Sequence, residues 1–306
     1  MLITLPTRKK RRLKRGRRQN VTINFEHLTP KKKGAVLNIQ DTLSLNVPSD
    51  LSDIADAYNQ EWDDESGQAH ELKNFIELTR DRECLLDIGG NIGFMSLTFL
   101  INNNDDARKY AYCVEPSKVG VATLGRILVH NDKDDRLDNV YVYEVFMGDK
   151  AGQCEFLLER GSNTLSVTYE KKDDPRFKID KGGAPPSYSQ MSTVDDFYRY
   201  TIDKQRKLPD TIKIDVEGYD YRVLLGAEKY LMIARPLMFL EVHRDLLNMY
   251  NDVAQNIWDF LSERQFDMYT LQRKKIESLD EYISLFDNTS ELRLVCSPTE
   301  SEMPWK

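Results

Sequence analysis

One short stretch of this chain constrains its fold more than any other. It runs from residue 85 to residue 93 and reads LLDIGGNIG, and an apolar segment from Phe94 to Leu100 follows it directly. The pattern predicts a short buried strand, a glycine-rich turn and then a helix. Such a turn lets the backbone come close to a bound ligand, and it is typical of α/β folds that bind a nucleotide-like cofactor.

Strand-like and helix-like segments alternate after this stretch. Strands are expected near residues 85–88, 110–115, 140–146, 211–216, 236–243, 266–271 and 292–296. Helical patterns separate most of them, and Ser117 is placed to cap the helix that follows the second strand. This alternation predicts a Rossmann-like sheet of seven mostly parallel strands with helices on both faces. The last strand is expected to be antiparallel, because the segment before it shows little helical pattern.

The remaining segments predict smaller elements around this sheet. They are an entry hairpin at 36–39 and 43–47, a helical stretch from 48, a helix at 66–78, a second hairpin at 153–158 and 164–169, a long surface loop at 171–189 and a helix at 219–231. The chain is therefore divided into four parts. They are an arm at residues 1–33, the hairpin and helices at 34–80, the main α/β domain at 81–298 and a tail at 299–306.

The first 33 residues are strongly basic. They hold twelve Lys and Arg against one acid, Glu26, in a chain whose overall net charge is −7. Residues 1–20 also lack a core pattern, so they are expected to be disordered. The basic residues at 8–18 suit contact with an anionic partner, either nucleic acid or a membrane surface, or a nuclear address. A solubilising tail is the alternative.

The lengths of the apolar runs and the spacing of the cysteines argue against several classes of protein. No run approaches the roughly 18 apolar residues of a membrane span, so no transmembrane segment is expected. No apolar region follows the basic cluster, as a secretory signal requires, so the expected location is cytoplasmic, or nuclear if the source is eukaryotic. The four cysteines lack metal-binding spacing, which predicts reduced core thiols: Cys84, Cys113, Cys154 and Cys296.

The glycine-rich turn itself narrows the choice of cofactor. Gly90 and Gly93 fit the second gap of the dinucleotide pattern G-x-G-x-x-G, but Ile88 stands where the first glycine belongs. This departure counts against a nicotinamide or flavin oxidoreductase. Asp87, at the end of the strand, instead suits a cofactor that carries a cationic group.

Acidic residues mark the ends of two further strands. Glu115 follows the second strand, where a carboxylate can accept hydrogen bonds from both hydroxyls of a ribose. Lys213, Asp215 and Glu217 share one face of a later strand. These side chains either take part in catalysis at the end of the strand, or Lys213 forms a structural ion pair with one of the two acids. Because parallel strands end at the same edge of a sheet, we expect these groups to meet around one ligand.

Five motifs together resemble one known family. They are DIGGNIG at 87–93, VEPS at 114–117, MGDKAG at 147–152, STVDDF at 192–197 and IKIDVEG at 212–218. In this order they are similar to the FkbM family of S-adenosylmethionine-dependent methyltransferases, over about residues 81–245. That family usually has Ala where Gly90 stands. The resemblance implies a class I methyltransferase fold, S-adenosyl-L-methionine as cofactor and, usually, O-methylation.

The resemblance also implies roles for single residues. Asp87, Gly89, Asn91 and Gly93 would shape the pocket for the methionine part of the cofactor, Glu115 would hold the ribose, and Phe146, Met147, Gly148 and Asp149 would lie near the adenine. Gly90 and Pro116 belong to the same expected cofactor site. Asp215 and Glu217 would lie near the transferred methyl group.

An oxygen nucleophile must lose its proton as it takes up a methyl group, so a general base is expected near that group. The candidates are Asp215, Glu217 and His243, and we expect the base to be Asp215 or His243. The ordinary pKa of histidine, about 6.5, suits proton transfer at neutral pH, although a histidine at a strand end can also be structural. A divalent cation held by an Asp/Glu pair is the less favoured route, and no metal ligand is assigned.

The acceptor is expected to be a hydroxyl of a sugar, glycan or other small metabolite. The candidates for its pocket are the loop at residues 160–189 with Tyr188, and Tyr219, Tyr221 and His243. The basic arm suggests a rival acceptor, an RNA ribose hydroxyl. That chemistry often uses a Lys-Asp-Lys-Glu tetrad, which residues on one strand tip do not reproduce. A non-catalytic protein that keeps the fold and the cofactor is the third alternative.

Overall fold

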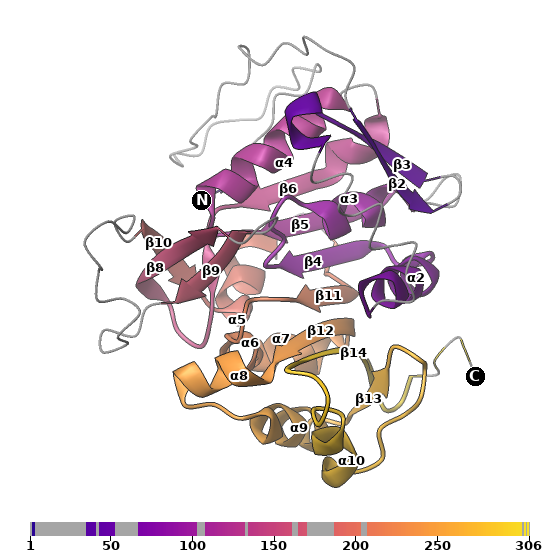
Figure 1. Cartoon of the computed structure of the whole chain (residues 1–306), viewed down its shortest axis with the longest axis vertical. Coiled ribbons are helices and arrows are strands. Elements are labelled where there is room, and N and C mark those ends of the chain that lie inside the picture. The colour runs from indigo at the N-terminus through magenta and orange to yellow at the C-terminus, as the bar shows by residue number, and fades with distance from the viewer. Residues whose placement is uncertain are drawn as a thin grey trace.

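The centre of the computed structural model is an eight-stranded sheet (Figure 1). Across the sheet the strands come in the order β1 (Leu2–Ile3), β6 (Val140–Tyr143), β5 (Tyr110–Val114), β4 (Cys84–Ile88), β11 (Thr211–Ile214), β12 (Leu237–His243), β14 (Glu291–Pro298) and β13 (Phe266–Thr270). The strands from β6 to β12 are parallel, and β14 is antiparallel to both β12 and β13. The seven predicted strands and the antiparallel last one are confirmed.

The structure describes residues 2–3, 35–40, 43–52, 67–102, 108–131, 134–160, 165–169, 187–202, 207–301, 303 and 305. Leu2 and Ile3 pair with β6 as the antiparallel strand β1, whereas the sequence placed them in a disordered arm. The rest of the predicted arm, the tip of the second hairpin and most of the predicted loop at 171–189 lie outside the described residues.

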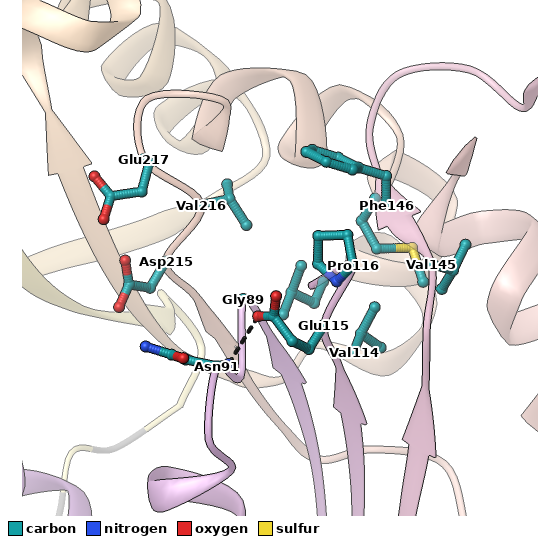
Figure 2. A pocket seen from close by; sticks show the side chains of 12 residues that line it. Gly89, Asn91, Val114, Glu115, Pro116, Val145, Phe146, Asp215, Val216 and Glu217 are labelled. Atoms are coloured by element: carbon teal, nitrogen blue, oxygen red, sulfur yellow. Dashed lines mark hydrogen bonds between the residues drawn. The ribbon is translucent and has the colours of Figure 1, made fainter. Parts of the chain in front are cut away.

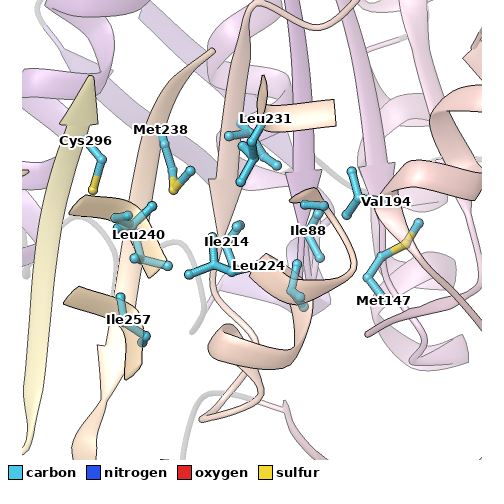
Figure 3. Close-up of a cluster of buried hydrophobic side chains, with 14 of the residues drawn as sticks. Ile88, Met147, Val194, Ile214, Leu224, Leu231, Met238, Leu240, Ile257 and Cys296 are labelled. Atoms are coloured by element: carbon cyan, nitrogen blue, oxygen red, sulfur yellow. The ribbon is translucent and has the colours of Figure 1, made fainter. Parts of the chain in front are cut away.

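Helices cover both faces of the sheet, as the alternating pattern predicted. On one face α2 (Gly67–Thr79), α3 (Phe94–Ile101) and α4 (Lys118–His130) share a core with Leu85 and Phe239. On the other face α5 (Val194–Phe197), α6 (Asp220–Leu225), α7 (Glu228–Ala234), α9 (Ala254–Glu263) and α10 (Leu279–Ser284) share a core with Ile88 and Leu240 (Figure 3). Odd and even residues of each strand thus enter different cores, because side chains alternate along a strand.

The helices begin and end for local reasons. Ser117 caps α4, since its Oγ accepts a hydrogen bond from the N–H of Gly120 at 3.2 Å. The single helix predicted over residues 219–231 is instead divided into α6 and α7. The break falls at Gly226, where an added Cβ would overlap the carbonyl oxygen of Gly148, so only glycine allows the two backbones to pack this closely.

A second, four-stranded sheet lies beside the main one (Figure 1). Its order is β7 (Phe146–Met147), β10 (Ser187–Ser192), β8 (Gly152–Arg160) and β9 (Leu165–Tyr169). The second predicted hairpin is confirmed as β8 and β9. Residues 187–189 were assigned to the loop but pair with β8 as part of β10. The strand predicted over 140–146 ends at Tyr143, whose carbonyl oxygen accepts hydrogen bonds from the N–H groups of Glu115 and Val145.

The entry hairpin is confirmed as β2 (Ala35–Gln40) and β3 (Leu43–Val47). At the other end of the chain Met303 is buried and the Trp305 ring lies 5.9 Å from the Tyr269 ring, so the tail packs onto the domain. The described part of the chain also contains five short helical turns: η1 (Ser49–Leu51), η2 (Asp135–Asn139), η4 (Tyr198–Ile202), α8 (Arg244–Leu247) and η5 (Asn248–Tyr250). The four cysteines are buried and free, as predicted. No helix in the described part of the chain is long and apolar enough to span a bilayer.

Candidate active site

The turn after β4 is pressed against the neighbouring strands. The N–H groups of Gly89 and Gly90 both donate to the carbonyl oxygen of Val114, at 3.0 and 3.1 Å. Gly89 has a φ of 81°, and a Cβ there would overlap the carbonyl oxygen of Asp215. Glycine is therefore required where the turn meets the end of β11. The turn leaves backbone exposed to a pocket at the C-terminal edge of the sheet.

Glu115 is the best-fixed side chain of this edge. Its Oε2 accepts a hydrogen bond from the N–H of Asn91 at 2.8 Å, and its Oε1 accepts one from the N–H of Ser117 at 2.7 Å. The residue is only 4% exposed, and this burial raises the pKa of Glu115 to about 7 although both hydrogen bonds act in the opposite direction. Each carboxylate oxygen keeps a second lone pair that a ligand hydroxyl can use.

The pocket lies where β4, β5 and β11 end, and Figure 2 shows its two walls. It opens to solvent, and the empty space in and above it amounts to about 550 Å³. Its lining residues are Ile88, Gly89, Asn91, Val114, Glu115, Pro116, Val145, Phe146, Met147, Asp215, Val216 and Glu217. Three carboxylates and several apolar side chains thus face one space, which suits a ligand with a cationic group and apolar parts.

Several residues that the sequence assigned to the cofactor lie behind this lining. Asp87 is buried, accepts a hydrogen bond from the Ser96 hydroxyl at 2.6 Å and has a pKa that burial raises. Gly93 has a φ of 79° and precedes α3. Gly90, Gly148 and Asp149 also lie outside the lining, and the Asp149 carboxylate pairs with Arg222 at 3.2 Å. These residues shape and support the pocket walls.

Asp215 brings a charged side chain to the pocket edge. Its Oδ2 accepts a hydrogen bond from Lys213 Nζ at 2.9 Å, and its side chain is 30% exposed. Burial alone would raise the pKa of Asp215, but the Lys213 ammonium holds that pKa below its ordinary value. Asp215 is therefore a carboxylate at neutral pH. Lys213 binds the Oδ2 atom of this carboxylate, and the partly exposed side chain lines the pocket, so Asp215 can also contact a ligand.

Glu217 enters the pocket through an unusual backbone conformation. It has a φ of 53° and is followed by Gly218 with a φ of 85°, so the chain turns through two successive left-handed residues. Asp220 supports this turn, because its Oδ1 accepts a hydrogen bond from the N–H of Val216 at 3.3 Å. No local sequence pattern shows that a glutamate adopts this conformation, although the glycine after it is a partial signal.

His243 does not line the pocket. Its side chain is 13% exposed, and Nε2 lies 3.4 Å from Glu241, 3.6 Å from Glu291 and 3.8 Å from Glu217. Tyr219 and Tyr221, expected at the acceptor, pack in hydrophobic clusters instead. Five charged residues that were not predicted from the sequence surround the Asp215 end of the site: Glu71, Asp220, Glu241, Glu291 and Arg293.

A divalent cation is not assigned to this cluster. Ligand atoms of Asp215, Glu241 and His243 lie within 4.8 Å of one another, which is a spacing that a metal could use. However, Lys213 and Arg293 each lie 2.9 Å from an oxygen of these carboxylates and already balance their charge. A bound cation would have to displace two buried positive side chains.

The sheet order, with a pocket at the ends of β4, β5 and β11, is that of a class I methyltransferase fold. A family model described as the methyltransferase FkbM domain matches residues 87–268, and the chain belongs to this family.

Solved structures of methyltransferases are similar to this chain at low identity. A methyltransferase FkbM from Methylobacillus flagellatus KT is 13% identical with a TM-score of 0.42, and the match covers 81% of this chain but only 60% of that chain. An O-methyltransferase from Bacillus cereus in complex with SAH is 12% identical with a TM-score of 0.42, covering 81% of this chain and 89% of that chain. These similarities are too low to indicate a substrate. No curated protein sequence matches the chain.

Proposed function

We propose that this protein transfers a methyl group from S-adenosylmethionine to a hydroxyl of a sugar, glycan or other small metabolite. The observation that supports it best is the Glu115 carboxylate, fixed by two backbone N–H groups at the edge of an acidic pocket. A ribose diol needs a rigid acceptor of this kind. The cofactor supplies an electrophilic methyl group on a sulfonium, whose positive charge suits the carboxylates of the pocket.

The lining residues divide into two groups in this proposal. Glu115 binds the ribose, Pro116, Phe146 and Met147 enclose the adenine side, and Gly89 and Asn91 border the methionine side. Asp215 and Glu217 face the acceptor side, because they lie across the pocket from Pro116 and Phe146 (Figure 2).

Asp215 is the proposed general base. Its carboxylate is ionised, partly exposed and held by Lys213 through one oxygen, so Oδ1 could receive the hydroxyl proton while the methyl carbon exchanges its bond to the sulfonium sulfur for a bond to the hydroxyl oxygen. Glu217 orients the acceptor hydroxyl. We expect D215N to lower turnover about 100-fold while the dissociation constant of S-adenosylmethionine changes little.

Two measurements test the proposal. Calorimetry with S-adenosylmethionine and its demethylated product asks whether the pocket binds the cofactor, and absence of binding at about millimolar cofactor would favour a non-catalytic protein. A labelled-methyl screen then compares sugars, glycans and RNA. Label in RNA alone, lost on deleting residues 8–18, would replace the small-molecule acceptor by a ribose hydroxyl in a nucleic acid.

A further inference from the structure

The strongest unassigned feature is a set of charges that β14 brings to the acceptor side. The antiparallel register places Arg293 opposite Glu241 and Glu291 opposite His243. Arg293 Nη2 lies 2.9 Å from Glu241, its Nη1 pairs with Glu291, and its Nε lies 3.2 Å from Glu71 on α2. Neither Glu71 nor this part of β14 falls within the residues that the family model matches.

The surroundings of His243 argue against the role of a base. Nε2 faces three carboxylates, so it is placed to donate a hydrogen bond. Nδ1 is buried and has no hydrogen-bond partner among the described residues, so an acceptor hydroxyl cannot reach it. A base needs a free lone pair within reach of the proton that it takes. His243 offers none to the pocket.

We propose that His243 is a positively charged positioning residue, anchored by Glu291 and Arg293 of β14, that keeps Glu217 turned into the pocket. Glu217 Oε2 lies 3.8 Å from His243 Nε2, close enough for the imidazolium to attract the carboxylate. Without that charge Glu217 faces the ionised Glu291 across the same imidazole, and the two like charges repel each other. This inference rests on the proposed acceptor-side role of Glu217.

The charges that face His243 come from every element packed around it. They are Asp215 and Glu217 after β11, Asp220 on α6, Glu241 on β12, and Glu291 and Arg293 on β14. Burial alone would lower the pKa of His243, but the contact with Glu291 and the nearby acids raise it above its ordinary value. The same contact lowers the pKa of Glu291 to about 2, so Glu291 stays ionised.

Glu291 and Arg293 should act on His243 in opposite directions. E291Q removes a negative charge that stabilises the protonated form of His243, so the NMR titration midpoint of His243 is expected to fall by about one pH unit. Removing the positive charge with R293Q leaves Glu291 less compensated, and the midpoint is expected to rise. R293Q/E291Q should return toward the wild-type value. R235Q, which removes a remote arginine paired with exposed Glu300, is the matched control and should leave the midpoint unchanged.

NMR of the four histidines, with H243N to identify the signal, gives this result on the free protein without an acceptor. The proposal would be overturned if the His243 midpoint shifted in the same direction in E291Q and R293Q, or if it shifted in neither variant. So would a wild-type midpoint well below 6.5, because His243 would then be neutral at pH 7. If the midpoints move as expected but no acceptor is methylated, the proposed function fails and the charge assignment of His243 stands.

The pH dependence of kcat distinguishes a positioning cation from a base by its sign. A base loses activity as pH falls through its pKa, whereas a positioning imidazolium loses it as pH rises. We therefore expect kcat to decline as pH rises through the His243 midpoint, and E291Q to move this decline to lower pH.

Variants at His243 test the same point. H243K should keep a measurable kcat and lose the alkaline decline, while H243N should lower kcat at least tenfold at constant cofactor affinity. D220N controls for the buried Asp220, whose pKa burial raises to about 7. An activity that rises through the His243 midpoint would reject the proposal.

Discussion

Two side chains that line the pocket come from left-handed backbone. Asn91 has a φ of 48° and Glu217 has a φ of 53°. This conformation costs a residue other than glycine about 1–2 kcal/mol. Strain of this size tends to persist where surrounding structure enforces it for function. Here the hydrogen bond between Asn91 and Glu115 and the support of Val216 by Asp220 enforce it.

Replacing Glu217 by glycine should separate stability from activity. Glycine adopts a positive φ freely, so E217G is expected to keep the free energy of unfolding or raise it by about 1 kcal/mol. Methyl transfer should nevertheless fall at least tenfold, because the side chain that orients the acceptor is gone. Urea unfolding and turnover measure the two effects, with E217Q as the control that keeps the side-chain length. If E217G were clearly less stable than E217Q, the left-handed conformation of Glu217 would not be strained.

Glu115 should make cofactor affinity depend on pH. Burial raises its pKa to about 7, so the carboxylate fraction grows as pH rises through that value. Ribose hydroxyls and a sulfonium both favour the ionised form, so the affinity for S-adenosylmethionine should rise between about pH 6 and about pH 8 and then level off. E115Q should bind about tenfold more weakly at the higher pH and show little pH dependence. Calorimetry across the range checks this, and an unchanged pH profile in E115Q would remove Glu115 from the ribose site.

At the scale of elements, the pocket depends on how closely the turn after β4 packs against β11. A methyl group added at Gly89 would overlap the carbonyl oxygen of Asp215, so G89A must push the two strand ends apart. We expect a loss of about 3 kcal/mol in the free energy of unfolding and at least a tenfold loss in cofactor affinity. The control is G90A combined with C113A, since a methyl group at Gly90 meets the Cys113 thiol first. Similar losses in both variants would count against a special role of Gly89.

Arg222 on α6 joins the loop after β7 to the segment before α9. It donates to Asp252 at 2.7 and 2.8 Å, to Asp149 at 3.2 Å and to the carbonyl oxygen of Tyr250 at 3.2 Å. Because Asp252 is buried, R222L should lower the free energy of unfolding by about 3 kcal/mol. R222L/D252N should recover a large part of this loss, since no buried carboxylate is left unpaired. Chemical unfolding of the three proteins measures it, and equal stability of the single and double variants would show that the ion pair is unimportant.

The site residues that could be predicted from the sequence are those that lie in local patterns at the ends of strands. The glycine turn, Glu115 and the Lys213–Glu217 run are local patterns at strand ends, so parallel pairing was enough to predict that they meet. Depth was harder to predict: Asp87 lies beneath the turn rather than in the pocket lining. Arg293 was missed because it reaches the site through the register of β12 and β14, which pairs it with Glu241. Register between strands far apart in sequence leaves no local signal.

At the scale of the whole molecule, charge is divided between a basic arm and an acidic remainder. Deleting residues 8–18 is expected to leave cofactor affinity unchanged, because the described residues from Ile88 to Glu217 already supply both walls of the pocket. Binding to single-stranded RNA at low salt should weaken, and the slope of log affinity against log salt should become shallower. Fluorescence anisotropy across salt concentrations measures both quantities. Equal salt slopes with and without the arm would make it a solubilising tail.

The position of β14 has a consequence for synthesis of the chain. β14 lies between β12 and β13, although it follows both in sequence. Until residues 291–298 leave the ribosome, the backbone groups along one edge of each of these strands have no partner. Such edges are templates for pairing with other chains. Nascent chains that stall before Glu291 are therefore expected to be the most aggregation-prone species this protein produces, and the most dependent on chaperones.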